Sequence, residues 1–163
     1  MSEDVIKQVL RMMPYGFYSV TSQSGSDINA MVSNWLVQVS FEPRLVALAL
    51  AKDAYTHGLI SQGRVFAVNL FRKEDQEAIK PFSKGRAKKP DKMDSATYTP
   101  GPVTGCPILE GAAAYLECHV TQIVDIGGDH NLVIGEVIGA GVVKPSEVAD
   151  ILTLPDLGWS YAG

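Results

Sequence analysis

A charged and a hydroxyl side chain follow the apolar run of residues 45–51 at a spacing that suits an anion. Lys52 supplies a positive charge and Thr56 a hydroxyl, and a predicted helix begins between them, with Asp53 and Thr56 as N-cap candidates. The N-terminus of a helix presents unpaired N–H groups and a partial positive charge, which favour phosphate. Strand-to-helix turns that contain a lysine are common, so the segment alone leaves a phosphate site and a purely structural turn both open.

Residues 29–35, with the sequence Asn-Ala-Met-Val-Ser-Asn-Trp, combine small and polar side chains with a tryptophan in a strand-like pattern. In a functional interpretation, the backbone of this strand hydrogen-bonds a planar ring, and the small side chains permit its close approach. In a structural interpretation, the strand has one polar face and Trp35 fills the core. The residues alone favour the structural interpretation.

The run Gly127-Gly128-Asp129-His130 is the third candidate, and its glycines and aspartate predict a tight hairpin turn. His130 begins the next strand, where it is either an exposed turn residue or a neutral imidazole that points into a pocket and titrates near neutrality. His57 is expected to be structural or solvated, and His119 to lie on the surface. Because no two histidines have ligand spacing on one element, the sequence predicts no metal site.

The overall composition is that of a globular protein and disfavours several classes of partner. A net charge of −4 and a pI of about 5.3 argue against nucleic acid. No stretch approaches 18 apolar residues and residues 1–10 lack a signal-peptide core, so no membrane association is expected. Cys106 and Cys118 form no metal spacing and are expected to be reduced, which predicts a cytoplasmic protein. The glycine motifs of dinucleotide-binding and α/β-hydrolase folds are absent from the sequence.

Hydrophobic periodicity predicts many short strands and only small helices. We expect strands at 15–22, 28–41 (one bent strand or two), 45–51 and 65–70, a turn at 22–27, and a hairpin of strands 112–125 and 132–143. Helices are expected at 3–13, from about 53 to 62, and at 74–82, followed by a polar, mobile surface loop at 83–95. In strand 112–125, Glu117 and His119 share the face opposite Cys118. The pattern predicts a mostly β barrel in a single domain spanning residues 1–163.

Six segments, in order along about a hundred residues, resemble the flavin reductase-like family with the FMN-binding split barrel. They are Asn29-Ala30-Met31 with Trp35, residues 39–47, Tyr55-Thr56-His57 with residues 59–60, residues 66–70, residues 111–118, and Gly128-Asp129-His130 with residues 134–137. The closing residues 156–161 also resemble the tail of relatives, some of which are modules of larger redox proteins. The resemblance implies a split β-barrel of Greek-key type that forms a homodimer with two equivalent sites.

The resemblance also implies where a flavin binds. Met31, Val32, Ser33, Asn34 and Trp35 would follow the ring, and Ala51, Lys52, Tyr55 and Thr56 would meet the phosphate. His130 matches the family's histidine near the ring and the place where nicotinamide docks, while Phe82, with Ser83, is a weaker match near the flavin edge or phosphate. Many relatives read Met-Thr-Ala-Ser-Trp, so Val32 here lacks the hydroxyl that a threonine would offer to the ring.

Two functions follow from this resemblance, and a flavin-binding barrel with other chemistry is a third possibility. The first is an NAD(P)H-dependent flavin oxidoreductase, in which a hydride passes from nicotinamide C4 to flavin N5. The alternative is a non-enzymatic electron-transfer module that serves a redox protein partner. We expect FMN rather than FAD, because the sequence contains one phosphate turn and no second pyrophosphate signature.

Overall fold

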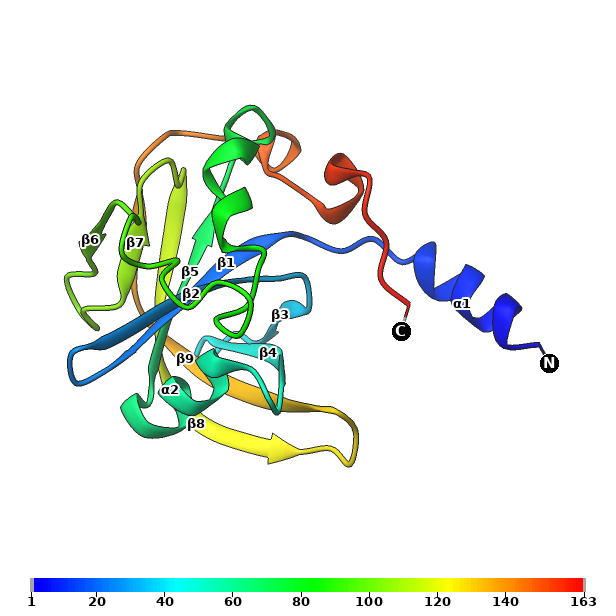
Figure 1. Cartoon of the computed structure of the whole chain (residues 1–163), viewed down its shortest axis with the longest axis horizontal. Helices are drawn as coiled ribbons and strands as arrows, with labels where there is room; N and C mark the ends of the chain where they lie inside the picture. The colour runs from blue at the N-terminus through cyan, green and yellow to red at the C-terminus, as the bar shows by residue number, and fades with distance from the viewer. Residues whose placement is uncertain (1, 163) are drawn as a thin grey trace.

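A seven-stranded antiparallel sheet with the strand order β2-β1-β5-β8-β9-β4-β3 forms the centre of the computed structural model, which describes residues 2–162. The strands are β1 (Tyr18–Ser24), β2 (Asp27–Ser33), β3 (Leu36–Ser40), β4 (Leu45–Ala51), β5 (Val65–Leu70), β8 (Ala114–Asp125) and β9 (His130–Val142). The sheet curls into a barrel (Figure 1) whose two edges are β2 and β3. These strands are consecutive in the chain but do not pair, so the barrel is split between them, and Asn34 and Trp35 connect its two edges.

Short helices and a small hairpin surround this sheet. The α-helices are α1 (Glu3–Arg11) and α2 (Tyr55–Gly63). The 3₁₀ helices are η1 (Lys73–Ala78), η2 (Lys80–Phe82), η3 (Val148–Asp150) and η4 (Leu154–Leu157). Strands β6 (Tyr98–Pro100) and β7 (Pro107–Leu109) pair with each other and lie beside β1 and β5. α1 projects away from the barrel (Figure 1) and buries none of its residues.

Two hydrophobic clusters hold β2 in place, one on each face. The barrel interior contains Val20, Leu48, Leu50, Phe66, Val68, Cys118, Val120 and Val133, and Met31 packs against it. The second cluster contains Phe17, Ala30, Phe71, Ile79, Phe82, Leu152 and Leu154, and Val32 packs against that one. Because successive side chains of a strand point to opposite faces, β2 is anchored on both sides, while no strand formed by residues 2–162 pairs with its outer backbone edge.

The predicted strands are present, with several bounds shifted. Residues 28–41 form two strands, β2 and β3, and the expected turn at 22–27 narrows to residues 25–26. The helix expected over 3–13 ends at Arg11. Residues 74–82 are not one helix: they belong to η1 and η2, and Pro81 within η2 has no N–H for a continuous helical ladder. The β6–β7 hairpin lies in a region for which the sequence predicted no element.

Burial corrects two further expectations. The segment 83–95 is not simply a surface loop, because Lys92 and Met93 are buried within it. Glu117 is fully buried, although it shares its face with the exposed His119. Its carboxylate accepts hydrogen bonds from the backbone N–H groups of Val103 and Thr104 and from the Thr104 hydroxyl, at 2.7–3.3 Å. The segment between β6 and β7 covers this part of β8, which local alternation does not reveal.

Candidate functional site

The split between β2 and β3 brings the first group of candidate residues together. β2 ends at Ser33, and Asn34 and Trp35 lead directly into β3 on the other edge. The Trp35 ring packs edge-to-face against His130, with centroids 5.0 Å apart, and against Tyr161 at 5.3 Å. An aromatic wall beside an unpaired strand edge offers stacking area together with backbone donors and acceptors, which are the groups that a planar heterocycle uses.

The β8–β9 hairpin holds His130 at this wall. His130 is the first residue of β9 and pairs with Ala51 of β4. Its Nδ1 lies 2.7 Å from Asp129 Oδ1, and this hydrogen bond is the main reason why the pKa of the Asp129 carboxyl is lowered. Because a carboxylate only accepts, the proton belongs on Nδ1 and Nε2 is the nitrogen available to a ligand. The turn before it requires Gly127, whose φ of 82° is left-handed.

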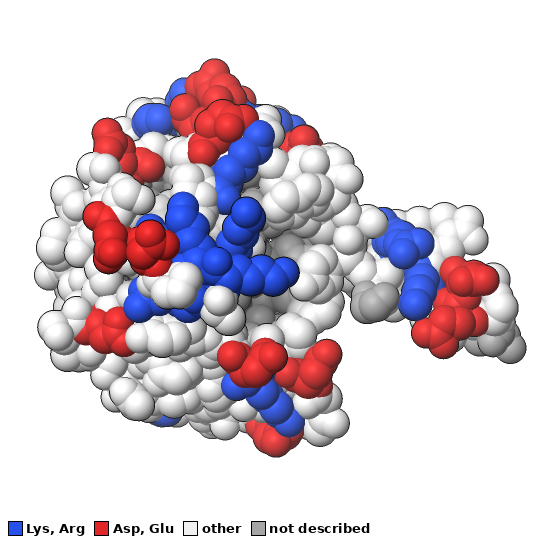
Figure 2. Space-filling view, in the orientation of Figure 1, with Lys and Arg blue, Asp and Glu red and all other residues white. Residues whose placement is uncertain are grey.

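A pocket of about 620 Å³ lies at the N-terminus of α2. It is lined by Asp53, Ala54, Tyr55, Gly85, Arg86, Ala87 and Pro90. Figure 2 shows Lys and Arg side chains gathered over this region, beside a hollow in the surface. The pocket therefore lies between the start of a helix and the basic loop, residues 83–95, and both features attract an anion.

Arg86 is the cation that faces this pocket. Its guanidinium carbon lies 4.5 Å from the centre of the Tyr55 ring, and Nη1 donates to the Ile28 carbonyl at 3.4 Å. Nη2 lies 3.9 Å from Asp27 Oδ1. The two polar contacts are long, so the guanidinium keeps donors for a ligand. Sequence reasoning missed Arg86 because it is one of five basic residues in the segment 83–95, and nothing in their spacing separates it from the others.

Tyr55 and Thr56 begin α2, but neither predicted N-cap is correct. The N-cap position is occupied by Ala54 and no side chain caps the helix, so its first N–H groups are not satisfied by Asp53 or Thr56. The Tyr55 hydroxyl donates to Asp27, and this hydrogen bond raises the pKa of Tyr55. The Asp27 carboxylate thus contacts both Tyr55 and Arg86 and fixes them at one side of the pocket.

Thr56 links the pocket to β2. Its side chain is buried, with 1% exposure, and its hydroxyl oxygen accepts a hydrogen bond of 2.8 Å from Asn29 Nδ2. The hydroxyl that the sequence predicted to bind phosphate thus has a structural partner in Asn29. His57 lies one residue further along α2, where Nε2 is 2.9 Å from Asn131 Nδ2, beside His130.

Lys52 points toward the hairpin turn and does not line the pocket. Its Nζ lies 2.9 Å from Asp125 Oδ1, and its backbone N–H donates to the Asp129 carbonyl at 3.0 Å. The pKa of Asp125 is lowered, first by the N–H of Gly127 and then by Lys52. The charge predicted to meet a phosphate is thus paired with a carboxylate, and Lys52 positions the turn that carries His130.

Phe82 also has a structural place. Its side chain is buried in the second hydrophobic cluster, together with Phe17 and Ala30, rather than in the aromatic wall. It ends η2, and the next residues lead to Gly85 and Arg86 of the pocket. Phe82 therefore anchors the basic loop to the outer face of β2.

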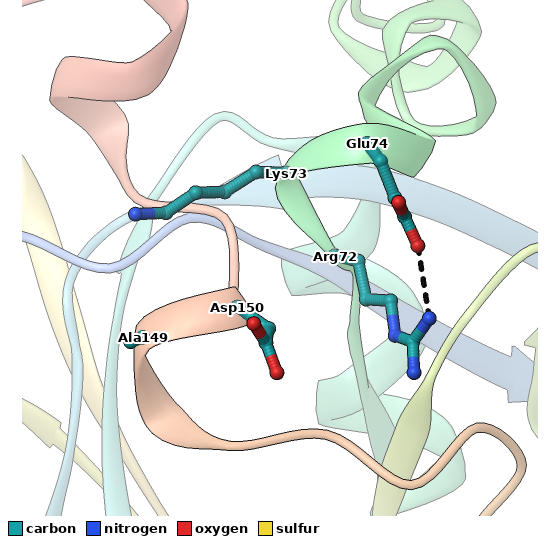
Figure 3. A pocket seen from close by; sticks show the side chains of 5 residues that line it. All are labelled: Arg72, Lys73, Glu74, Ala149 and Asp150. Atoms are coloured by element: carbon teal, nitrogen blue, oxygen red, sulfur yellow. Dashed lines mark hydrogen bonds and ion pairs between the residues drawn. The ribbon is translucent and has the colours of Figure 1, made fainter.

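A different pocket, of about 360 Å³, is lined by Arg72, Lys73, Glu74, Ala149 and Asp150 (Figure 3). Figure 3 shows the Arg72 guanidinium turned toward Glu74, at 2.9 Å. Arg72 also donates from Nε to Ser146 Oγ at 2.8 Å and from Nη2 to the Pro145 carbonyl. Through these contacts Arg72 holds the C-terminal segment against the end of β5. Its donors are therefore occupied, and this pocket offers an anion less than the pocket at α2 does.

The residues at the split suit a flavin better than a metal. Within residues 2–162, Asn29 Oδ1 near the start of β2 and Asn34 Nδ2 just after its end are buried without hydrogen-bond partners. Asn34 Nδ2 is a donor beside Trp35, and a flavin ring carries acceptors that such a donor can meet. Within residues 2–162, no three His, Cys, Asp or Glu side chains come together as metal ligands.

No helix in that same range is long and apolar enough to cross a membrane.

Comparison with known proteins places this chain and its fold in one family. The family model described as flavin reductase like domain matches residues 10–154. An NADH-dependent FAD reductase of Streptomyces globisporus is 32% identical over 136 residues, which cover 83% of this chain and 74% of that protein. The solved structure of the NADH:FAD oxidoreductase of Streptomyces globisporus C-1027 with NAD and FAD fragments superposes with a TM-score of 0.75, at 31% identity, covering 86% and 82% of the two chains. A high molecular weight rubredoxin of Moorella thermoacetica is 30% identical over 142 residues, 86% of this chain but only 61% of that protein. The chain belongs to the flavin reductase-like family.

Proposed function

We propose that this chain is an NAD(P)H-dependent flavin oxidoreductase that holds FMN along β2, with the ring at the split of the barrel and the phosphate at the start of α2. The observation that carries the proposal is the continuity of β2 between the two ends of the site. Its first residues, Asp27 and Ile28, contact Arg86, and its last residue leads to Trp35 beside His130. Six residue steps of a strand span about 20 Å, which accommodates a ring and a phosphorylated side chain.

The residues of the chain bind and orient, and the cofactor supplies the redox chemistry. A flavin held at this site would supply the redox chemistry, namely hydride acceptance at N5 from nicotinamide C4. The outer backbone edge of β2 and the side chain of Asn34 hydrogen-bond the polar side of the ring, and Trp35 excludes water from its edge. His130, with its proton fixed on Nδ1 by Asp129, positions the nicotinamide through Nε2.

Arg86 and the uncapped N-terminus of α2 bind the phosphate. An arginine binds phosphate oxygens through two parallel N–H groups, and helix N–H groups add further donors. The pocket is lined by one cationic side chain, Arg86, beside Tyr55, which supports FMN with its single phosphate as the resident flavin, whereas the Streptomyces relative is named for FAD. Heat release followed by chromatography against both standards tests this choice, and recovery of FAD would contradict it.

A homodimer is part of the same proposal. Large apolar side chains remain exposed on β3 and after it, including Val37, Val39 and Phe41, and on α1, including Ile6 and Val9. Burying such surface against a second copy is favourable. Light scattering should therefore give twice the monomer mass of 17.6 kDa. The continuous sheet supports a single domain over residues 1–163, and two buried, unpaired cysteines support a reducing, cytoplasmic location.

The similarity to a high molecular weight rubredoxin favours a second candidate, an electron-transfer module that serves a redox protein partner. Stopped-flow mixing with NADH and with NADPH separates the two functions. An oxidoreductase bleaches the flavin absorbance with at least one nicotinamide, whereas a module is reduced only by a partner protein.

The same experiment tests His130. His130→Ala should slow bleaching on the order of tenfold, equivalent to about 1.4 kcal/mol in the barrier, while FMN affinity stays the same. His119→Ala, which removes an exposed imidazole from β8, is the matched control. Loss of FMN binding in His130→Ala would move this residue from the nicotinamide side to the flavin site itself.

A further inference from the structure

A buried lysine belongs to the basic segment 83–95, whose residues Gly85, Arg86 and Pro90 line the pocket at the start of α2 that we propose for phosphate. This lysine, Lys92, itself lines a different, smaller pocket. The Lys92 side chain is 2% exposed, and its Nζ makes one hydrogen bond, of 3.0 Å, to the carbonyl of Lys84. Within residues 2–162 no carboxylate lies at ion-pair distance from it, although eight such pairs form elsewhere. Lysine is almost never fully buried unless paired, because the desolvated charge is costly. The missing counter-ion therefore requires an explanation.

The surroundings of Lys92 increase the cost of its charge. Phe82 and Ala96 line the small pocket beside it, and Met93 anchors the segment in the second hydrophobic cluster. Burial first, and the Arg86 charge second, lower the pKa of Lys92 to about 8. The folded protein thus holds an amine that is only partly charged in weakly alkaline solution.

Other charged groups near Lys92 do not neutralise it. Glu110 lines the same small pocket but forms no ion pair with the amine. Asp91 and Asp94, on its own segment, are exposed to solvent. The Asp27 carboxylate faces Arg86 and Tyr55 instead.

The hydrogen bond of Lys92 connects it to the wall of the phosphate pocket. Lys84, whose carbonyl accepts from Nζ, directly precedes Gly85 and Arg86, which line that pocket. An ammonium has three donors, and two of those on Lys92 have no protein partner in the structure. A phosphate dianion in the pocket would supply the nearby negative charge that the protein itself lacks.

We propose that Lys92 is the second cation of the phosphate site, and that it takes up a proton when a phosphate dianion binds next to Arg86. The inference rests on the proposed flavin site and adds a pH-dependent control of cofactor retention. A nearby dianion favours the ammonium form, so the pKa of Lys92 is higher in the complex than in the free protein.

The sign of the pH dependence follows from this difference. Below pH 8 the amine is charged in both states, and FMN affinity is at its maximum. Above pH 8 the free protein loses the proton and binding must restore it, so the affinity falls by up to about tenfold per pH unit until the pKa of the complex is reached. Riboflavin has the same ring and no phosphate, so its affinity does not share this dependence.

The test measures the dissociation constants of FMN and riboflavin between pH 7 and 9.5 by fluorescence quenching. We expect the preference for FMN over riboflavin to fall above pH 8. Calorimetry at pH 8.5 in two buffers of different ionisation enthalpy should show uptake of a fraction of a proton with FMN and none with riboflavin. A flat FMN preference without proton uptake would overturn the role of Lys92 and leave the flavin site intact. No preference for FMN at any pH would instead contradict the phosphate pocket itself.

Substitutions of Lys92 test whether this side chain is the group that takes up the proton. Lys92→Met has a similar volume and should weaken FMN binding about ten- to a hundredfold at pH 7, with riboflavin unaffected and no pH dependence. Lys92→Arg stays charged and should restore affinity with a flat pH profile. Lys84→Met, at an exposed position on the same loop, is the control and should change affinity less than threefold. If Lys92→Met retained the wild-type pH profile, another group would take up the proton and the proposal would be wrong. If this variant does not fold, the proton uptake of the wild-type protein measured by calorimetry decides the question.

Discussion

Two surface pockets of this protein each contain an arginine, and their hydrogen bonds differ. Arg72 is satisfied by Ser146, Glu74 and the Pro145 carbonyl, and holds the C-terminal segment against the barrel. Arg86 makes one hydrogen bond of 3.4 Å and one ion pair of 3.9 Å, and faces the start of α2. The N–H donors of Arg72 are used in hydrogen bonds within the protein, whereas those of Arg86 remain largely available to a ligand. Two arginines that each line a surface pocket thus differ in the donors they keep free, and this difference is set by their partners and not by residue type.

Arg86→Ala should produce the largest effect on cofactor binding. Charge-assisted hydrogen bonds contribute roughly 1.5–3 kcal/mol, so FMN affinity should fall on the order of ten- to a hundredfold. Riboflavin affinity, measured by the same fluorescence titration, should change much less. Equal losses for both ligands would show that Arg86 shapes the loop and does not bind phosphate.

Arg72→Ala should reverse this pattern. Removal of its hydrogen bonds should destabilise the protein by about 2 kcal/mol, which corresponds to a decrease in Tm of roughly 4–8 °C. The dissociation constant of FMN at 25 °C should stay within about twofold of the wild type, because the pocket of Figure 3 is separate from the start of α2. If Arg72→Ala greatly weakened FMN affinity and left the Tm unchanged, Arg72 would be a ligand-binding residue like Arg86, and the proposed difference between them would be wrong.

Lys52→Ala should have the smallest effect. Its charge is paired with the exposed Asp125, and exposed pairs contribute little because solvent and salt screen them. FMN affinity should change less than threefold, and nicotinamide-driven bleaching should slow modestly, because the turn that carries His130 loses one anchor. A tenfold loss of affinity for FMN, without a matching loss for riboflavin, would instead show that Lys52 binds the phosphate.

Comparison of the two ends of the site shows which parts were predictable from sequence. The proposed ring end consists of β2, Trp35 and the Gly-Gly-Asp-His turn; local signals predicted the strand and the turn, but only the family resemblance assigned them to a flavin. The proposed phosphate end contains Arg86 and the buried Lys92, which look in the sequence like ordinary members of the basic segment 83–95. Their roles arise when Phe82 and Met93 anchor that loop against the outer face of β2.

The amino-acid sequence by itself indicated the strands of the main sheet and the tight turn before His130, because these depend on residues close together in the chain, and the order of six short motifs carried the resemblance to a flavin-binding family. The tertiary structure decided which strands form the two edges of the barrel, that Glu117 is buried, and that Lys52 pairs with Asp125 while Arg86 faces the pocket. The physical reason is that burial and charge pairing are set by neighbours dozens of residues away. A cation in a loop therefore acquires its role only when the fold supplies, or withholds, its partner.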